Sequence, residues 1–109
     1  MTYRVVLTAE AEEDLLRLFD FLVERELAHG GGDLELAQRA LDAIKDAIKD
    51  AFKLLEQFPF TCRKVGPSAF LRELVIPFGH TGYVALFEIL DRQTVAIAAV
   101  RHHREDDYH

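Results

Sequence analysis

Cysteine, methionine, proline and tryptophan are scarce in this sequence, with one, one, three and none among its 109 residues. The single cysteine, Cys62, has no second cysteine with which to form an internal disulfide, so the chain is not a disulfide-stabilised scaffold. No CxxC or Cys/His spacing surrounds it, and a structural zinc site needs such a spacing. We therefore expect Cys62 to be an ordinary packing or loop residue.

Long apolar runs and an excess of positive charge are also missing. No apolar segment approaches the roughly 20 residues that cross a bilayer, and the first residues lack the order of a secretory signal. The sequence therefore predicts a cytoplasmic protein that does not bind membranes. With 13 Lys and Arg against 19 Asp and Glu, the formal net charge is −6. This balance argues against broad, sequence-independent binding of nucleic acid, because phosphate neutralisation supplies most of that affinity.

The composition that is present is typical of a soluble globular protein. Hydrophobic residues make up 50% of the chain and charged residues 29%, which are ordinary proportions for a folded domain. The sequence has no internal repeat, no low-complexity segment and no long linker. Because the length suits a single hydrophobic core, we expect residues 1–109 to form one domain.

The N-terminal part has the pattern of a strand followed by a helix. Residues 2–8 alternate and are rich in β-branched side chains, which predicts a short strand. Residues 9–28 carry apolar side chains at three- and four-residue spacing, so they are expected to form a helix with one buried stripe. Thr8 is placed to cap this helix, and the acidic residues of its first turns suit the positive end of the helix dipole.

A break and a second helix follow. The sequence HGGGD at residues 29–33 interrupts the helical period, and three glycines favour a helix end. The second helix is expected to run from residue 34 to the pair Phe58-Pro59, because the residue before a proline is pushed out of the helical region. The break has room for a turn and nothing longer, so the two helices should form an antiparallel hairpin.

The C-terminal part changes to the alternation of strands. We expect strands at residues 70–76, 82–90 and 94–102, the last two joined by the short turn Asp91-Arg92-Gln93. The predicted fold class is therefore α+β with the order β-α-α-β-β-β. In this fold the helical hairpin packs on one face of a small antiparallel sheet, and the opposite face or an adjacent cleft is left for a ligand.

The residues with the strongest chemical interest lie on the predicted strands and at the C-terminus. If the last strand pairs near residues 70–76, two guanidiniums approach on one face, where a phosphate or a partner's carboxylate is the natural counterion. Metal-free RNA cleavage needs a base, cations on the phosphate and an acid, and His103, Arg72 with Arg101, and Tyr108 are candidates for those roles. The candidate residues for either partner binding or catalysis are Arg72, Arg101, His103, Arg104 and Tyr108.

A structural interpretation of the same residues competes with the functional one. In it, Arg72 pairs with Glu73 or Glu88, and the end of the chain is a solvated tail in which three acids neutralise the cations. A run of carboxylates beside a phosphate site would also repel the substrate. The adjacent His102 and His103 point to opposite sides of a strand, so we expect no metal site, and nothing in the sequence calls for a cofactor.

Several stretches of the sequence, together with this order of elements, resemble the RelE/ParE superfamily of toxins from bacterial type II toxin–antitoxin modules. The stretches are AEAEEDLLRLFDFL, LLEQFPF, LRELVIPFGHTGYVALFEI and VAIAAVRHHREDDY. The likeness is closest to the ParE-like branch, often called plasmid stabilisation system toxins. It implies a small cytoplasmic toxin that a cognate antitoxin holds inactive, with the pair repressing its own operon.

The resemblance leaves two targets, messenger RNA in the ribosome for RelE-like members and DNA gyrase for ParE-like members. Arg72 and Arg101 match two arginines of the RelE-like pattern, and His103 or Tyr108 stands where that pattern has a C-terminal tyrosine or histidine. The sequence departs from the RelE-like pattern in two ways: few basic residues precede the strand that carries Arg72, and the chain as a whole is acidic. We therefore favour a non-enzymatic gyrase inhibitor.

Two alternatives stay open beside the gyrase inhibitor, a ribosome-dependent endoribonuclease and a non-toxic structural relative. In the favoured reading, the candidate residues bind a partner, first the antitoxin and then the cellular target. An added peptide segment can extend the sheet or lie in its groove. Extra apolar positions on the first helix are compatible with a homodimer, and the antitoxin implies a hetero-oligomer.

Overall fold

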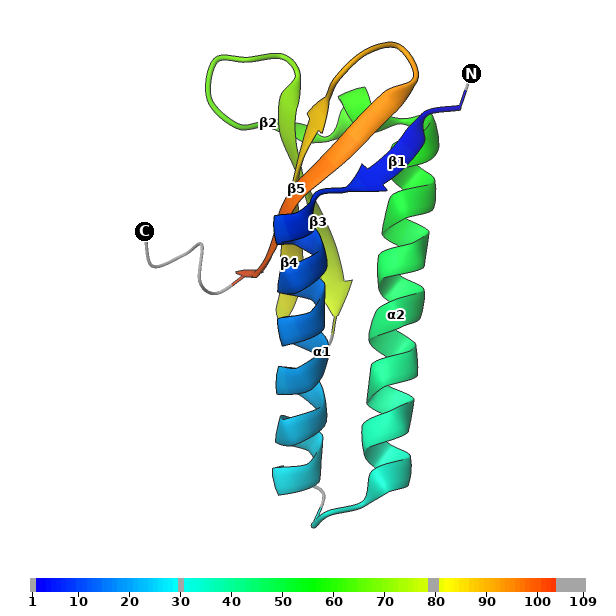
Figure 1. The fold of residues 1–109 in the computed structure, drawn as a ribbon, viewed down its shortest axis with the longest axis vertical. Helices are drawn as coiled ribbons and strands as arrows, with labels where there is room; N and C mark the ends of the chain where they lie inside the picture. Colours follow the sequence, from blue (N-terminus) through cyan, green and yellow to red (C-terminus); the bar gives the residue numbers. More distant parts are fainter. Residues whose placement is uncertain (1, 30, 79–80, 104–109) are drawn as a thin grey trace.

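The protein folds as two long helices packed on one face of a five-stranded sheet (Figure 1). The structure, a computed structural model, describes residues 2–29, 31–78 and 81–103. No helix within these ranges is both long and apolar enough to cross a membrane. The elements are β1 (Arg4–Leu7), α1 (Ala9–His29), α2 (Leu34–Gln57), the 3-10 helix η1 (Pro59–Thr61), β2 (Arg63–Lys64), β3 (Leu71–Phe78), β4 (Thr81–Ile89) and β5 (Thr94–His102).

This architecture confirms the predicted α+β fold and adds two features to it. The sheet order is β1-β5-β4-β3-β2, and β1 runs parallel to β5, so the sheet is mixed instead of wholly antiparallel. A short turn forces antiparallel pairing, but β1 and β5 are joined by most of the chain, so their direction is free of that constraint. The second feature is β2 with the preceding η1, which are too short to leave a periodic pattern in the sequence.

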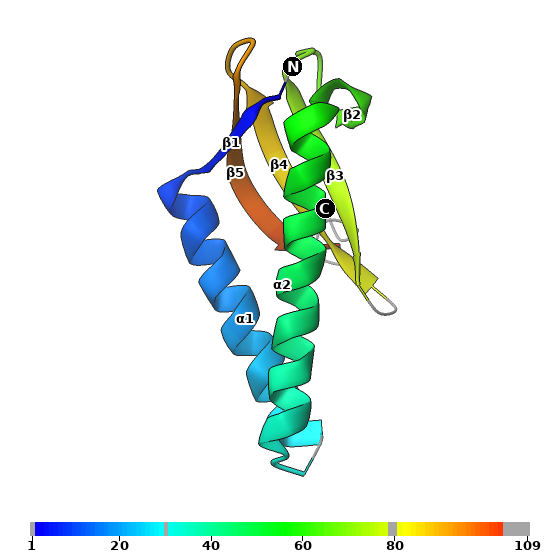
Figure 2. The ribbon, with the colours of Figure 1, turned by 90° about the vertical axis from the view of Figure 1, so that its right-hand side faces the viewer.

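Side-chain caps fix where the two helices begin. The Thr8 hydroxyl accepts a hydrogen bond from the Ala11 N–H at 3.1 Å. The Asp33 carboxylate accepts from the Glu35 and Leu36 N–H groups at 2.9 and 3.3 Å. Each cap contributes about 1 kcal/mol by satisfying backbone donors that have no partner inside the helix. The helical hairpin extends past the end of the sheet, as Figure 2 shows.

The hydrophobic core lies between the hairpin and the inner face of β3, β4 and β5. It has contributions from both helices and from the alternating positions of these strands. Deleting one of its large side chains would cost about 3–5 kcal/mol, because the neighbours close over a cavity only partly. The largest fully buried side chains are Phe87, Ile44, Leu55, Ile76, Ile97, Val95 and Pro59.

One irregularity in β5 changes which way its side chains face. Phe87 of β4 pairs with Ile97, but the neighbouring Leu86 pairs with Ala99, so Ala98 is an extra residue in β5. Such a bulge reverses the alternation of the residues that follow it. Ile97 faces the helices before the bulge, and Val100 faces them after it.

Candidate partner-binding groove

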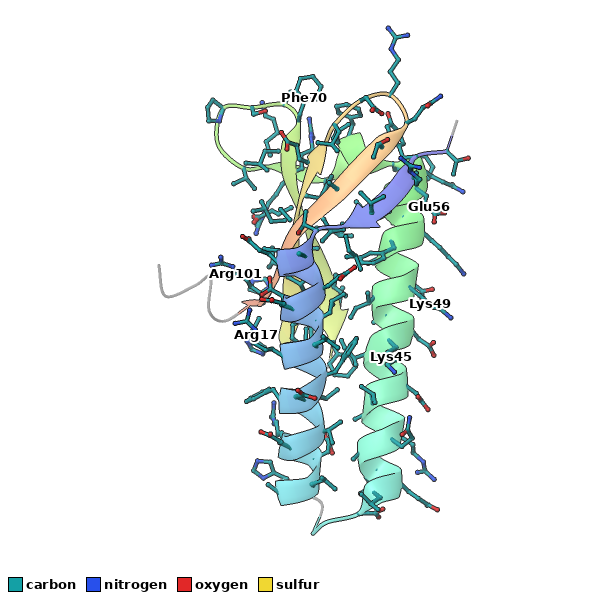
Figure 3. All side chains as sticks on the ribbon, in the orientation of Figure 1. Arg17, Lys45, Lys49, Glu56, Phe70 and Arg101 are labelled. Carbon is teal, nitrogen blue, oxygen red and sulfur yellow. The ribbon has the colours of Figure 1, made fainter. Side chains whose placement is uncertain are left out.

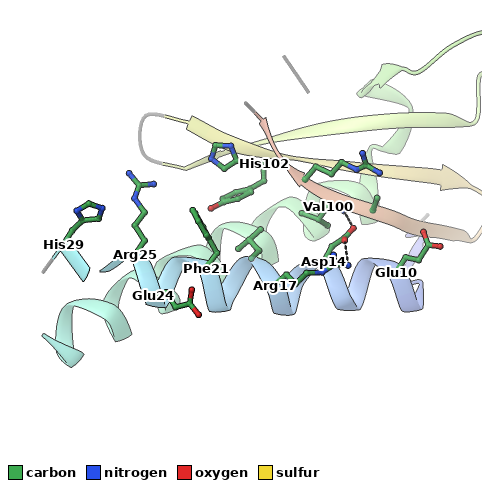
Figure 4. Close-up of a pocket in the computed structure, with 13 residues that line it drawn as sticks. Glu10, Asp14, Arg17, Phe21, Glu24, Arg25, His29, Val100 and His102 are labelled. Atoms are coloured by element: carbon green, nitrogen blue, oxygen red, sulfur yellow. Dashed lines mark hydrogen bonds and ion pairs between the residues drawn. The ribbon is translucent and has the colours of Figure 1, made fainter. Parts of the chain in front are cut away.

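A groove runs between α1 and the second half of β5 (Figure 4). β1 pairs with β5 only from Thr94 to Ile97, so among the described residues no strand lies beside the remaining outer edge of β5. Helix α1 takes that place and leaves a groove of about 1100 Å³ beside it. The lining residues that matter below are Asp14, Arg17, Phe21, Arg25, Arg101 and His102.

Hydrogen bonds from the start of α1 occupy the edge of β5 where β1 ends. The Thr8 N–H donates to the Ile97 carbonyl at 3.0 Å, and the Thr8 hydroxyl donates to the Ala98 carbonyl at 3.2 Å. The Asp14 carboxylate then accepts from the Val100 N–H at 3.0 Å. These contacts replace bonds that a neighbouring strand would make, so the edge is closed to strand addition over these residues.

The charges along the groove are unevenly neutralised. Arg17 lies 3.7 Å from Glu13 and 3.5 Å from Asp14, which places two carboxylates beside one guanidinium. Arg25 and Arg101 make no ion pair within residues 2–29, 31–78 and 81–103. The groove therefore offers two cations to the carboxylates of a partner.

Apolar and aromatic side chains form the rest of the groove. Phe21 on α1 is 58% exposed and lines the groove. Tyr83 on β4 is buried, and its ring and the His102 ring form a T-shaped contact with 5.4 Å between the ring centroids. Burial raises the pKa of the Tyr83 hydroxyl, and the charge of Arg25 acts in the opposite direction. The surface suits a segment that combines acidic and apolar side chains.

Arg101 lies on the face of the sheet that is turned away from the helices. It pairs with Val84, and Val84 pairs with Val75, so these three side chains share one face. Val100 and His102, its neighbours in β5, face the helices instead. Arg101 is exposed, so its guanidinium is accessible at the rim of the groove.

Arg72 has entirely different surroundings. Its guanidinium donates to the carbonyls of Ala69, Phe60 and Cys62 at 2.8, 2.8 and 2.7 Å. It also lies 5.2 Å from the centroid of the Phe60 ring, in a cation–π arrangement. These contacts tie the segment between α2 and β3 to the sheet, so Arg72 is a structural residue.

The expected pairing of Arg72 with Glu73 or Glu88 is wrong. The Glu73 carboxylate instead forms an ion pair with Arg63 of β2, which lies directly opposite it in the sheet. Arg72 follows the other face of β3, where it points toward η1 and the helices. The physical reason is the alternation of a strand, which places neighbouring side chains on opposite faces.

The structure does not bring Arg72 and Arg101 together. β4 lies between their strands, and Arg72 and Val75 are an odd number of residues apart, so Arg72 faces opposite to Val75 and Arg101. Cys62, whose carbonyl accepts a hydrogen bond from Arg72, is buried as a packing residue. Burial raises the pKa of its thiol, and the Arg72 charge opposes that rise.

The other candidate residues lie at the end of the chain. His103 follows directly after β5 and is partly buried. Arg104 and Tyr108 lie outside the described residues. In the described part of the chain, no group of three His, Cys, Asp or Glu side chains is arranged to hold a metal ion.

Sequence reasoning missed Asp14 and Arg25 as site residues. The acidic first turns of α1 were interpreted through the helix dipole, which does not distinguish Asp14 from its neighbours. A signal was present, because Asp14 and Arg25 lie at helical spacing from Leu18 and so follow the edge of the buried stripe. At such a position Asp14 reaches the neighbouring strand β5, whereas Arg25 is exposed and lines the groove.

Comparisons with known proteins bear on the family and the fold of the chain. Residues 5–107 match the family model described as ParE toxin of type II toxin-antitoxin system, parDE. The chain is 33% identical over 90 residues to Toxin RelE1 of Caulobacter vibrioides, and these residues cover 83% of this chain and 83% of that toxin. A solved structure of the chromosomal ParDE TA system from P. aeruginosa has a similar fold, with a TM-score of 0.58 and 17% identity over 93% of this chain and 96% of that one.

Proposed function

Because this chain belongs to the family of ParE toxins of type II toxin–antitoxin systems, we propose that it inhibits DNA gyrase and that its cognate antitoxin occupies the α1–β5 groove. Family membership implies an antitoxin as a partner. The choice of gyrase over messenger RNA is carried by a single observation, the separation of Arg72 from Arg101 on opposite faces of the sheet.

RNA cleavage without a metal needs several groups around one phosphate. Cations have to lie on the phosphate oxygens while a base and an acid reach the attacking and leaving oxygens. The Arg72 guanidinium is committed to three backbone carbonyls and a phenyl ring. A toxin that binds a protein target needs no such constellation, which is why this geometry favours gyrase.

The groove fits an antitoxin segment that binds through its side chains. Arg25 and Arg101 lack ion-pair partners among the described residues, and Phe21 is an exposed apolar side chain between the two walls. The bonds from Thr8 and Asp14 disfavour strand addition along the second half of β5. Of the two binding modes that we considered from the sequence, lying in the groove is therefore favoured over extending the sheet.

The second candidate function is a ribosome-dependent endoribonuclease. One observation favours it, since the curated relative at 33% identity is named Toxin RelE1. In this function Arg72, Arg101 and His103 would be the residues whose loss abolishes activity while folding is retained. Arg72→Ala is expected to impair folding, so Arg101→Ala is the informative variant of the three.

The test adds the purified protein to two parallel assays. One is gyrase supercoiling of a relaxed plasmid, and the other is cleavage of a message during translation on ribosomes. Blocked supercoiling with an intact message supports the proposal. Cut message with normal supercoiling contradicts the proposal and supports the endoribonuclease function. No effect in either assay, together with normal growth when the protein is expressed, identifies a non-toxic relative.

A further inference from the structure

We propose that Asp14 is a positioning residue that keeps β5 in its bulged register and thereby holds Arg101 at the outer rim of the groove. The inference rests on the proposed function for the role of Arg101, but its structural part stands alone. It begins from the Val100 N–H, which points to the edge of β5 that no strand of the described part of the chain covers. The Asp14 carboxylate supplies the missing acceptor at 3.0 Å.

The acceptor matters because the site is largely closed to water. The Asp14 side chain is 22% exposed, and Val100 is part of the buried core. An N–H left without a partner in such a place is costly, and a carboxylate is a stronger acceptor than a neutral oxygen. The two carboxylate oxygens have different tasks, since one faces Arg17 and the other accepts from Val100.

A competing register exists for the end of β5. Without the bulge at Ala98, the residues after Ile97 would shift by one position relative to β4, and Arg101 would pair with Tyr83 in place of His102. Because a shift by one residue reverses every side chain, Arg101 would then face the helices. The bulged register is the one in which the Val100 N–H meets Asp14 and the Ala98 carbonyl meets the Thr8 hydroxyl. Asp14 therefore selects the register that leaves Arg101 accessible.

Three variants separate the hydrogen bond from the ion pair. Asp14→Ala removes both the acceptor for Val100 and the partner of Arg17. Asp14→Asn retains an acceptor oxygen without the charge, and Arg17→Ala removes the ion pair while leaving the acceptor. Arg17 is 74% exposed, so its loss should disturb the fold little.

The first measurement is amide hydrogen exchange at Val100, with Val95 in the half of β5 covered by β1 as an internal reference. We expect Asp14→Ala to accelerate exchange at Val100 about tenfold or more relative to Val95. Asp14→Asn should recover most of the protection, and Arg17→Ala should match the wild type. Nuclear Overhauser contacts between Arg101 and the Tyr83 ring should appear only in Asp14→Ala.

The second measurement is the affinity of each variant for the purified cognate antitoxin. Asp14→Ala should lower this affinity about as much as Arg101→Ala, and Asp14→Asn should restore it.

Unchanged exchange at Val100 in Asp14→Ala, or equal acceleration in Asp14→Asn, overturns the inference. If Asp14→Ala does not fold, Asp14→Ser replaces it, since its hydroxyl is too short to reach Val100. A wild-type protein that neither binds the antitoxin nor inhibits gyrase defeats the proposed function, while the exchange data still decide the role of Asp14.

Discussion

Arg72 and Arg101 are the same residue type on two strands of one sheet, yet their surroundings are opposite. Arg72 donates to three carbonyls and lies over the Phe60 ring, whereas Arg101 is exposed and has no ion-pair partner among the described residues. The difference comes from the face of the sheet and from the loops nearby. An arginine that a family pattern marks as functional can be committed to the backbone, and only the geometry distinguishes the two cases.

The largest expected effect is on folding stability. Arg72→Ala should lower the free energy of unfolding by about 2–3 kcal/mol, because three carbonyls lose a charged donor and the contact with the Cys62 carbonyl is partly buried. Arg101→Ala should change it by less than about 0.5 kcal/mol, since the side chain is exposed. Urea unfolding monitored by circular dichroism gives both values.

The matched control for this prediction is Arg72→Lys. A lysine retains the charge but cannot reach the three carbonyls in the geometry of a guanidinium, so it should recover little of the lost stability. Similar losses for Arg72→Ala and Arg101→Ala would remove the distinction between a structural and an accessible arginine.

The next effect concerns partner binding. Arg101→Ala should weaken antitoxin affinity about tenfold or more, because it removes a cation at the rim of the groove. The control is Lys49→Ala on α2, which Figure 3 shows on the other side of the molecule from Arg101. Lys45 is less suitable as a control because its ammonium lies 5.5 Å from the centroid of the Phe19 ring. Titration calorimetry measures both affinities, and equal losses would contradict a role for Arg101 in binding.

A smaller effect is expected at Arg63, the neighbour of the Arg72 cluster. Arg63→Ala removes the ion pair with Glu73 from the exposed face of β2. Because exposed ion pairs are weak, the free energy of unfolding should fall by about 0.5 kcal/mol. The same urea titration compares it with Arg72→Ala, and a loss as large as that of Arg72→Ala would show that charge near this strand matters more than the carbonyl contacts.

The elements of the fold were predictable because each has a local cause in the sequence. The helix caps Thr8 and Asp33, the glycines that end α1 and the alternation of 94–102 all act within a few residues. The confirmed strand β5 spans the same residues as its prediction. The parallel pairing of β1 was missed because it depends on contacts between residues far apart in the chain.

The geometry of the site was less predictable for a related reason. A single inserted residue, Ala98, decides which face Arg101 occupies, and no residue type marks a bulge of this kind in the sequence. Arg72 likewise depends on the path of the segment from Phe60 to Ala69, whose carbonyls it meets. Residue type indicated that these arginines were important, but their tasks follow from tertiary contacts.

The smallest effect appears only at alkaline pH, and it compares the surroundings of Arg72 with the groove. Cys62 lies beside Arg72, Tyr83 lies near Arg25, and burial raises the pKa of both groups above their ordinary values of 9.0 and 10.0. Each group holds its proton more tightly in the folded state, so its contribution to stability is complete below the ordinary pKa and is lost as the pH rises through the folded value. The free energy of unfolding of the wild type should therefore decline above about pH 9.

Cys62→Ala should flatten the first part of that decline and Tyr83→Phe the later part, in urea titrations at successive pH values. The Arg72 charge opposes the rise at Cys62, so Arg72→Ala should raise the pKa of the thiol further, whereas Arg72→Lys should leave that pKa nearer its wild-type position. An unchanged pH profile in Cys62→Ala would show that its thiol is not desolvated.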